Sequence, residues 1–175
     1  MQGVAPTTAA PRTPPRPPDA EQLRFGGVVE SPRRDVFVRT DRKIARNNSS
    51  ATVTDTEEFS WTVSRSVTVE HQRAAVHGTT ATLTLPVLLS LGQTLQRELR
   101  STYALATEAT LTRTKTVSVE IPPHSSIELE LTWKIVRQPG FGRFTDTGGL
   151  KVDLPYEVDM EIELDWRTND IAGPS

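Results

Sequence analysis

Alternation of apolar and polar side chains is the dominant pattern along the chain. In residues 57–71, EEFSWTVSRSVTVEH, apolar side chains fall at every second position and serine or threonine fills most of the gaps, with Arg65 as an interruption. The same alternation recurs in residues 110–121, 127–135 and 156–166. Because successive side chains of a strand point to opposite faces, the pattern predicts four long amphipathic strands with one buried and one hydrated face.

The apolar faces of these strands are the predicted core. All three tryptophans lie on them, which favours a packing role over a ligand platform. The runs exceed the usual strand length of about five or six residues, so the predicted fold is mainly β, a tall antiparallel twisted sheet or sandwich of long strands. The core candidates are Trp61, Val117, Val119, Leu129, Leu131, Trp133, Met160, Ile162, Leu164 and Trp166.

One segment departs from the period of two. Residues 87–104 place leucines at helical spacing, and Pro86 stands where a first helical turn tolerates proline, so a single helix packed on the sheet is predicted. Residues 81–91 also alternate, with threonines between the apolar positions, which favours a strand in a different state. Both interpretations make 79–105 the candidate functional segment, with Leu83, Leu85, Val87, Leu88, Leu91, Leu95 and Leu99 as its apolar residues.

Glycine and proline mark the predicted connections. Short edge strands are expected in LRFGGVVESP and DVFVRT, and loops in ARNNSS, RAAVHG, PPHSS and RQPGFGRFTDTGG. The double proline Pro122–Pro123 is expected to end a strand ladder, since neither ring nitrogen can donate a hydrogen bond. The expected organisation is a tail over residues 1–21, a single β-rich domain over 22–168 and a C-terminal tail over 169–175.

The N-terminal tail is rich in proline and arginine. Six prolines within residues 1–21 remove amide donors and fix φ, so disorder or polyproline II is expected there. Its PRTPPRPP stretch carries a PxxP spacing beside Arg12 and Arg16, which fits a ligand for a proline-reading groove. The alternative interpretation is a solubilising tether.

Composition narrows the function classes. The chain has 175 residues, a net charge of -2, three histidines and no cysteine, which excludes disulfides and thiolate metal sites and gives no global field for nucleic acid. It contains no apolar run long enough for a membrane helix and no visible N-terminal signal. The expected location is cytoplasmic at first, or export by a route that reads no such signal.

Catalytic motifs are not apparent in the sequence. His71, His77 and His124 lie beside predicted strand ends, at spacings that fit no zinc motif, and no nucleophile elbow or phosphate loop occurs. The acidic positions from Asp153 to Asp165 fit a hydrated strand face, and the basic run 33–46 is expected to pair with acidic residues 157–165. A non-enzymatic protein without metal, cofactor, nucleic acid or small-molecule substrate is therefore expected.

The order of the patterned segments resembles a known family. The stretch ARNNSSATVTDTEEFSWTVSRSVTVE, followed by TLTRTKTVSVEIPPHSSIELEL, is similar to the aerolysin/epsilon-toxin group of β-pore-forming proteins over residues 45–166. The resemblance implies a twisted sheet of long Ser/Thr-lined strands, self-assembly, and membrane insertion of segment 79–105 as a released hairpin. The other hypothesis is a non-enzymatic protein–protein interaction or assembly module of an intracellular complex, tethered by the proline-rich tail.

Overall fold

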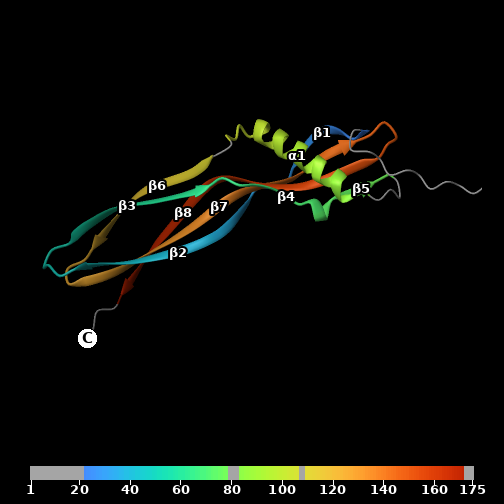
Figure 1. Ribbon diagram of the computed structural model, residues 1–175. Coiled ribbons are helices and arrows are strands. Elements are labelled where there is room, and N and C mark those ends of the chain that lie inside the picture. Colours follow the sequence, from blue (N-terminus) through green and yellow to red (C-terminus); the bar gives the residue numbers. More distant parts are fainter. Residues whose placement is uncertain (1–21, 79–82, 107–108, 172–175) are drawn as a thin grey trace, which may run out of the picture.

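The computed structural model describes residues 22–78, 83–106 and 109–171. It is mainly β, with antiparallel strands and one helix, as predicted (Figure 1). The proposed proline-rich tail over residues 1–21 lies outside the described residues. The elements in chain order are β1 Arg24–Glu30, β2 Arg34–Asn47, β3 Val53–Ser64, β4 Val67–Val69, the short 3-10 helix η2 His71–Arg73, β5 Ala75–His77, α1 Leu85–Thr102, β6 Thr110–Ile121, β7 Ser125–Thr145 and β8 Lys151–Ile171.

The hairpin of β7 and β8 runs through the whole elongated molecule (Figure 1). Along the free side of β7, β2 pairs with one half and β1 with the other. Along the free side of β8, β4 and β5 pair only with residues 151–158. The remaining two strands, β3 and β6, form a separate two-stranded ribbon that packs over the β2 half of the main sheet.

The prediction of a loop in RQPGFGRFTDTGG is wrong over most of that stretch, because β7 continues through it to Thr145. Pro139 lies where the neighbour of β7 changes from β2 to β1, since β2 pairing stops at Arg137 and β1 pairing starts at Gly140. Proline has no backbone N–H to donate, and this is tolerated where neither β2 nor β1 pairs with β7 at that residue. At Gly140 a Cβ atom would lie 2.5 Å from the carbonyl oxygen of Val29, so only glycine fits this close approach.

The buried side of β7 changes along its length. Its buried apolar residues fall at odd positions from Ile127 to Ile135, and its buried residues fall at even positions from Val136 to Phe144. Since successive side chains of a continuous strand alternate, these two sets lie on opposite faces. In β8, Met160 is a bulge residue between the pairs Asp159–Arg137 and Glu161–Val136, so β8 keeps even-numbered residues in both buried clusters.

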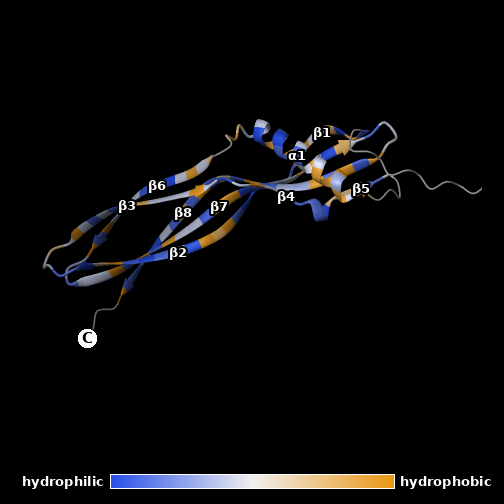
Figure 2. Cartoon of the chain, in the orientation of Figure 1, coloured by the Kyte–Doolittle hydropathy of each residue, from blue (hydrophilic) through white to orange (hydrophobic). Residues whose placement is uncertain are grey.

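Two apolar clusters result from this switch. One joins α1 to the β1 half of the sheet and contains Leu95, Phe144 and Leu154. The other joins the β3–β6 ribbon to the β2 half and is centred on Trp133. Orange and blue residues alternate along these strands in Figure 2, as expected for amphipathic strands.

Most of the core candidates fall in the ribbon cluster. Val117, Leu129, Leu131, Trp133, Ile162 and Leu164 are buried there, with Trp61 and Val119 partly buried against them. Met160 packs against the α1 cluster instead. Trp166 is a correction, because its side chain is 39% exposed. It follows Leu164, the last buried residue of β8, and residues 165–170 are all exposed.

Two further boundaries differ from the sequence prediction. The single strand expected over residues 57–71 is divided into β3 and β4, which belong to different sheets. At the other end of the chain, β8 extends to Ile171 and so includes the first three residues of the segment 169–175 that was assigned to a tail. The predicted helix over 87–104 is present as α1 and starts two residues earlier.

Candidate functional site

The candidate segment 79–105 lies inside a connection between two paired strands. Ser64, the last residue of β3, pairs with Thr110, the first residue of β6. Residues 65–109 are therefore the connection of a β3–β6 hairpin. Instead of turning back directly, this connection adds β4 and β5 to the main sheet and lays α1 across it before returning (Figure 1).

The outer face of the β3–β6 ribbon carries a row of hydroxyl groups. Three cross-strand pairs are hydrogen bonded: Thr56 with Ser118 at 2.9 Å, Ser60 with Thr114 at 3.0 Å and Thr62 with Thr112 at 2.9 Å. All six residues are exposed. Such pairs stabilise two strands modestly while leaving the face uncharged and hydrated, so the ribbon holds together without a second layer on that side.

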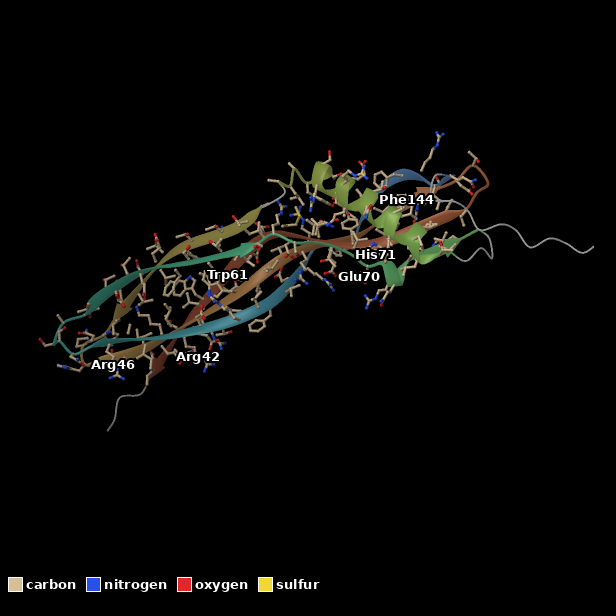
Figure 3. All side chains as sticks on the ribbon, viewed as in Figure 1. Arg42, Arg46, Trp61, Glu70, His71 and Phe144 are labelled. Carbon is tan, nitrogen blue, oxygen red and sulfur yellow. The ribbon has the colours of Figure 1, made fainter. Side chains whose placement is uncertain are left out.

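An aromatic contact fixes the inner face of the ribbon to the main sheet. Trp61, labelled in Figure 3, lies on this inner face. It meets Trp133 edge to face, with ring centroids 5.7 Å apart. The Arg39 guanidinium lies 5.5 Å from the Trp61 ring and 5.9 Å from the Trp133 ring. Trp133 donates its indole N–H to Asp41 Oδ2 at 2.9 Å, so its buried polar atom is satisfied.

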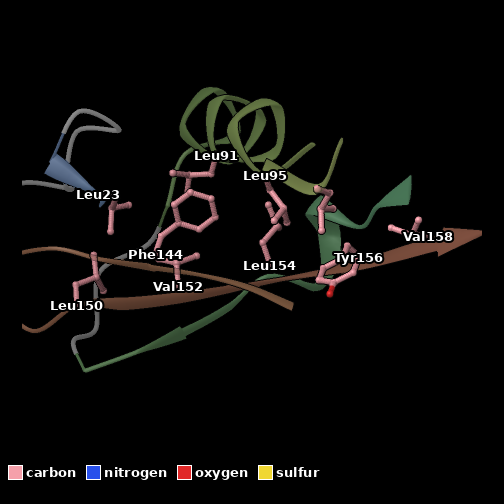
Figure 4. Close-up of a cluster of buried hydrophobic side chains, with 10 residues drawn as sticks. Leu23, Leu91, Leu95, Phe144, Leu150, Val152, Leu154, Tyr156 and Val158 are labelled. Carbon is pink, nitrogen blue, oxygen red and sulfur yellow. The ribbon is translucent and has the colours of Figure 1, made fainter. Parts of the chain in front are cut away.

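Helix α1 packs on the sheet through a leucine stripe and two close glycine contacts. Leu95 is fully buried directly over Gly142, where a Cβ atom would lie 2.3 Å from Leu95 Cδ1 (Figure 4). On the helix itself, a Cβ atom at Gly92 would lie 1.9 Å from His71 Nε2. Both glycines therefore let the helix approach its neighbours more closely than any larger residue would allow.

The apolar candidates of the segment divide into three groups. Leu91, Leu95 and Leu99 are buried, and Leu83, Val87 and Leu88 are half-buried. Leu85 is 64% exposed. The helical spacing identified from the sequence is therefore the one that α1 uses for docking, and the residues that fit only the alternating pattern lie near its exposed N-terminal turn.

A tyrosine pair holds the C-terminal end of α1. Tyr103, which follows the helix, donates its hydroxyl hydrogen to Glu30 Oε1 at 2.7 Å and lies 3.0 Å from the Tyr156 hydroxyl. Burial, followed by these hydrogen bonds, raises the pKa of Tyr103 well above its usual range. Burial also raises the pKa of Tyr156. The helix end is therefore tied to both β1 and β8.

A buried carboxylate ties down both ends of the 65–109 connection. Asp159 is 4% exposed; it accepts hydrogen bonds from Arg137 Nε at 2.8 Å and from Ser66 Oγ at 2.6 Å. Its backbone carbonyl accepts from Arg65 Nε at 2.6 Å. Since the Arg65 amide donates to the carbonyl of Ala109 at 2.9 Å, the outgoing and returning chains meet here. This crossover explains why the strand predicted over 57–71 breaks at Arg65.

The sequence analysis did not identify Asp159, Tyr156 or Gly142 as parts of this arrangement. Asp159 was assigned to a hydrated acidic face, and Gly142 to a loop. The sequence alone could not predict that Asp159 is buried. Its side chain turns inward beside the bulge at Met160, and that bulge depends on the register of β8 with β7. The sequence showed that Arg65 interrupts the alternating pattern, but it did not show that Asp159 is the hydrogen-bond partner of Arg65.

The remaining charged and titratable candidates are dispersed. His71 lies in η2, His77 at the end of β5 and His124 in the turn between β6 and β7. Over residues 22–78, 83–106 and 109–171, no three His, Asp or Glu side chains are grouped as a metal site would require. In the same ranges no helix has the length and apolar character needed to span a membrane.

The basic run 33–46 pairs with acidic residues on four strands, among them Asp41 of β2 with Arg39 at 3.2 Å and Glu57 of β3 with Lys43. Arg34 forms an ion pair with Glu157 of β8, as the sequence analysis expected. Arg42 pairs instead with Glu130 of β7 at 3.1 Å. Because β7 lies between β2 and β8, an acidic residue of β7 is nearer to β2 than an acidic residue of β8.

Comparison with known proteins identifies similar solved structures. No family profile and no curated protein sequence matches the chain. Among solved structures, a candidate pore-forming toxin of Bacteroides vulgatus is 10% identical with a TM-score of 0.40, over 83% of this chain and 57% of that one. Parasporin-2 of Bacillus thuringiensis is 13% identical with a TM-score of 0.35, over 83% and 74% of the two chains. An aerolysin-like protein of Bombina maxima is 13% identical with a TM-score of 0.30, over 84% and 97%.

The chain therefore spans little more than half the length of the Bacteroides structure. The similar structures include aerolysin-like and pore-forming toxin proteins, the group that the sequence pattern resembles.

Proposed function

We propose that the protein is a non-enzymatic pore-forming module that acts by self-assembly and by membrane insertion of segment 79–105. The observation that carries the proposal is the pairing of Ser64 with Thr110. It makes residues 65–109 the connection of a ready-formed antiparallel ribbon, although most of that connection is packed elsewhere in the described structure. Release of the connection would lengthen the ribbon without breaking any β3–β6 hydrogen bond.

The dual patterning of the segment supports two packed states. As a helix, it buries Leu91, Leu95 and Leu99 against the sheet. As an extension of the ribbon, the segment would place Leu83, Leu85, Val87 and Leu91 on one face. The threonines that alternate with the first of these residues would lie on the other face. That arrangement presents an apolar face to lipid and a hydroxyl-rich face to water, as the strands of membrane barrels do.

The energetic requirement is a membrane that replaces the lost burial. Each fully buried leucine contributes roughly 1.5–3 kcal/mol, so undocking the three buried leucines of α1 costs on the order of 5–9 kcal/mol. Contact with lipid would restore this free energy of burial, because the same leucine side chains would again be removed from water. In lipid, every backbone N–H and C=O must also be paired, which requires ribbons from several copies to close into one barrel.

Besides the leucine packing of α1, two localised polar contacts would have to open. The Tyr103 contact with Glu30 and Tyr156 holds one end of α1, and the Asp159 crossover holds the base of the connection. The β3–β6 ribbon, in contrast, is fixed by the Trp61–Trp133 contact and its own ladder. The proposed motion therefore separates residues 66–109 from the main sheet while the ribbon remains intact.

Release of a dye from liposomes, measured beside the size of the protein with and without them, tests the proposal. We expect dye release that rises steeply with protein concentration, together with a membrane-bound oligomer. A protein that stays monomeric and releases no dye would contradict the proposal. That outcome would favour the interaction-module hypothesis, in which the leucines of α1 stay packed and the sheet binds another protein.

A further inference from the structure

The two outer strands in the β2 half of the main sheet have open edges. In the described part of the chain β2 pairs only with β7, which lies between β2 and β8 (Figure 1). On the outer side of β8, pairing with β4 ends at Val158, and the Asp159 amide donates to the carbonyl of Ser66. Beyond that point residues 160–171 have no described strand on their outer side. The N–H and C=O groups of such edges are ready to pair with another strand.

The edge of β2 is protected over only part of its length. The register with β7 shifts at Val38, and irregularities of this kind interrupt pairing along an edge. From Arg39 to Asn47 the register is unbroken, and Ile44, which is 48% exposed, lies within this stretch. The regular stretch is therefore longer than an ordinary strand of about five or six residues, and its open side is suited to strand addition.

The two open edges carry opposite charge. Residues 39–47 contain four basic and one acidic side chain, a formal charge of +3. Residues 160–171 contain four acidic and one basic side chain, a formal charge of -3. Because β2 and β8 lie on opposite sides of β7, one copy of the chain presents a basic edge on one side of its sheet and an acidic edge on the other.

Part of this charge is not paired within the described structure. Arg42 is paired with Glu130 at 3.1 Å, and Asp165 with Lys134 at 2.6 Å. Other charged side chains of the two edges form no ion pair with another described residue. On β2 this is Arg46, which is labelled in Figure 3, and on β8 these are Glu161, Glu163 and Asp170.

We propose that a second copy of the chain covers each open edge, with residues 39–47 of one copy paired to residues 160–171 of the next. A contact between two β2 edges would oppose +3 to +3, and a contact between two β8 edges would oppose -3 to -3. Like charges on neighbouring strands destabilise a sheet, so only the unlike edges are complementary. A contact between two different surfaces, repeated from copy to copy, builds a ring when its rotation closes.

The direction of the new ladder follows from the sheet. Both β2 and β8 are antiparallel to β7, so the two strands run in the same direction. In a ring of identically oriented copies, β2 of one copy and β8 of its neighbour therefore form a parallel pair, with evenly spaced hydrogen bonds.

This contact is the interface for the self-assembly step, and in that respect it rests on the proposed function. It uses no residue of α1 and no residue of the β3–β6 ribbon. Assembly through the sheet edges and release of segment 79–105 are therefore separate events, and each can be measured without the other.

Charge reversal with mixing tests the interface in the full-length chain. Lys43→Glu with Arg46→Glu makes both edges negative, and Glu161→Lys with Glu163→Lys makes both edges positive. On neutral phosphatidylcholine liposomes, chemical cross-linking should show that each variant alone needs at least about tenfold more protein to oligomerise. An equimolar mixture of the two should assemble like the native chain, because every edge then meets one of opposite sign. Misfolding of either variant cannot produce this recovery.

The matched control is Arg24→Glu with Lys151→Glu. It changes the net charge as much as the first variant does, and both residues are exposed in the other half of the sheet. This variant should oligomerise at the same protein concentration as the native chain. High salt should weaken assembly of the native chain, since it screens charges at an exposed edge.

The outcomes separate this interface from pore formation. Oligomers of either reversed variant at native concentrations, or a mixture that does not recover, would overturn the interface and leave dye release to decide the proposed function. Recovery in the mixture without any dye release would support the interface and contradict the pore. A native chain that stays monomeric with and without liposomes would overturn both.

Discussion

The docking of α1 on the sheet includes a close contact between Leu95 and Gly142. Leu95 has no exposed surface, and a Cβ atom at Gly142 would lie 2.3 Å from its Cδ1 atom. Leu95→Ala removes a fully buried side chain, so the free energy of unfolding should fall by about 2–5 kcal/mol. Gly142→Ala inserts a methyl group into occupied space, which should lower it by about 1–3 kcal/mol.

The combined variant distinguishes direct packing from two independent effects. The new methyl group at position 142 enters the cavity left by Leu95→Ala, so the double variant should be more stable than the sum of the single effects by at least about 1 kcal/mol. Gly148→Ala serves as the matched control for the second site. The three nearest atoms to a Cβ atom there belong to the Asp146 carboxyl group, at 3.4 Å or more, so its effect should add to that of Leu95→Ala.

Urea unfolding of the full-length variants, followed by tryptophan fluorescence and far-ultraviolet circular dichroism, measures these differences. The two signals must coincide for the free energies to be comparable. If the Leu95→Ala and Gly142→Ala effects add within about 0.3–0.5 kcal/mol, the two residues do not share space. The proposed packing of α1 on β7 would then be refuted.

Three further predictions concern the ribbon, the tyrosine contact and the crossover. Trp133→Ala should lower the free energy of unfolding by about 3–5 kcal/mol, because Trp133 is 1% exposed. Thr114→Ala, on the exposed hydroxyl face of the ribbon, should lower it far less. Equal shifts in the urea midpoint of the two variants would contradict this assignment of faces. The pKa of Tyr103 is raised in the folded state, so the protein should lose stability as the pH rises above about 10, where the unfolded tyrosine ionises, and the loss should be smaller in Tyr103→Phe. A pH series of urea melts checks this, and identical alkaline slopes would count against the contact. Asp159→Ala should cost about 1.5–3 kcal/mol, because it removes a buried carboxylate that accepts hydrogen bonds from Arg137 and Ser66. Asp165→Ala, which removes an exposed partner of Lys134, should cost about 0–1 kcal/mol, and similar losses in thermal melts would argue against the crossover.

The long strands and the helix were predictable because burial leaves a local signature. The alternation around Trp133 and the helical spacing from Leu88 to Leu99 each report one buried face, whatever it packs against. Residue types along each strand were therefore enough to predict which face is buried. Val117, Leu131 and Ile162, predicted as core, lie inside the ribbon cluster.

The path of the chain was not predictable from the same patterns, because it depends on partners distant in sequence. Arg65 interrupts one alternating run, but only the backbone of Asp159, which is 94 residues away, explains why the strand ends there. Pro139 reads as a loop residue in isolation and is tolerated in β7 because two neighbouring strands meet beside it. Trp166 follows the buried alternation, yet it lies beyond the point where its strand is covered.

The candidate segment 79–105 was chosen from the sequence by its two overlapping periods, but the residues that anchor it could not be predicted. The contact of Tyr103 with Glu30 and Tyr156 joins three elements, and nothing in the local sequence of any of them indicates the other two. An open groove beside Leu85 and Leu89 likewise forms only when η2 lies next to α1. Patterns along one chain segment report its buried face, whereas sites built from several segments require the fold.

Dye release by a protein whose helix is locked to the sheet tests the central claim most directly. A Cβ atom at Gly142 would lie 3.1 Å from Leu95 Cγ, the position that the new sulfur of Leu95→Cys would take, so Leu95→Cys with Gly142→Cys should form a bond between α1 and β7. The native chain has no cysteine to compete. We expect the oxidised variant to bind liposomes without releasing dye, and the same sample to release dye once reduced. Equal release before and after reduction would contradict the claim that the segment must leave the sheet.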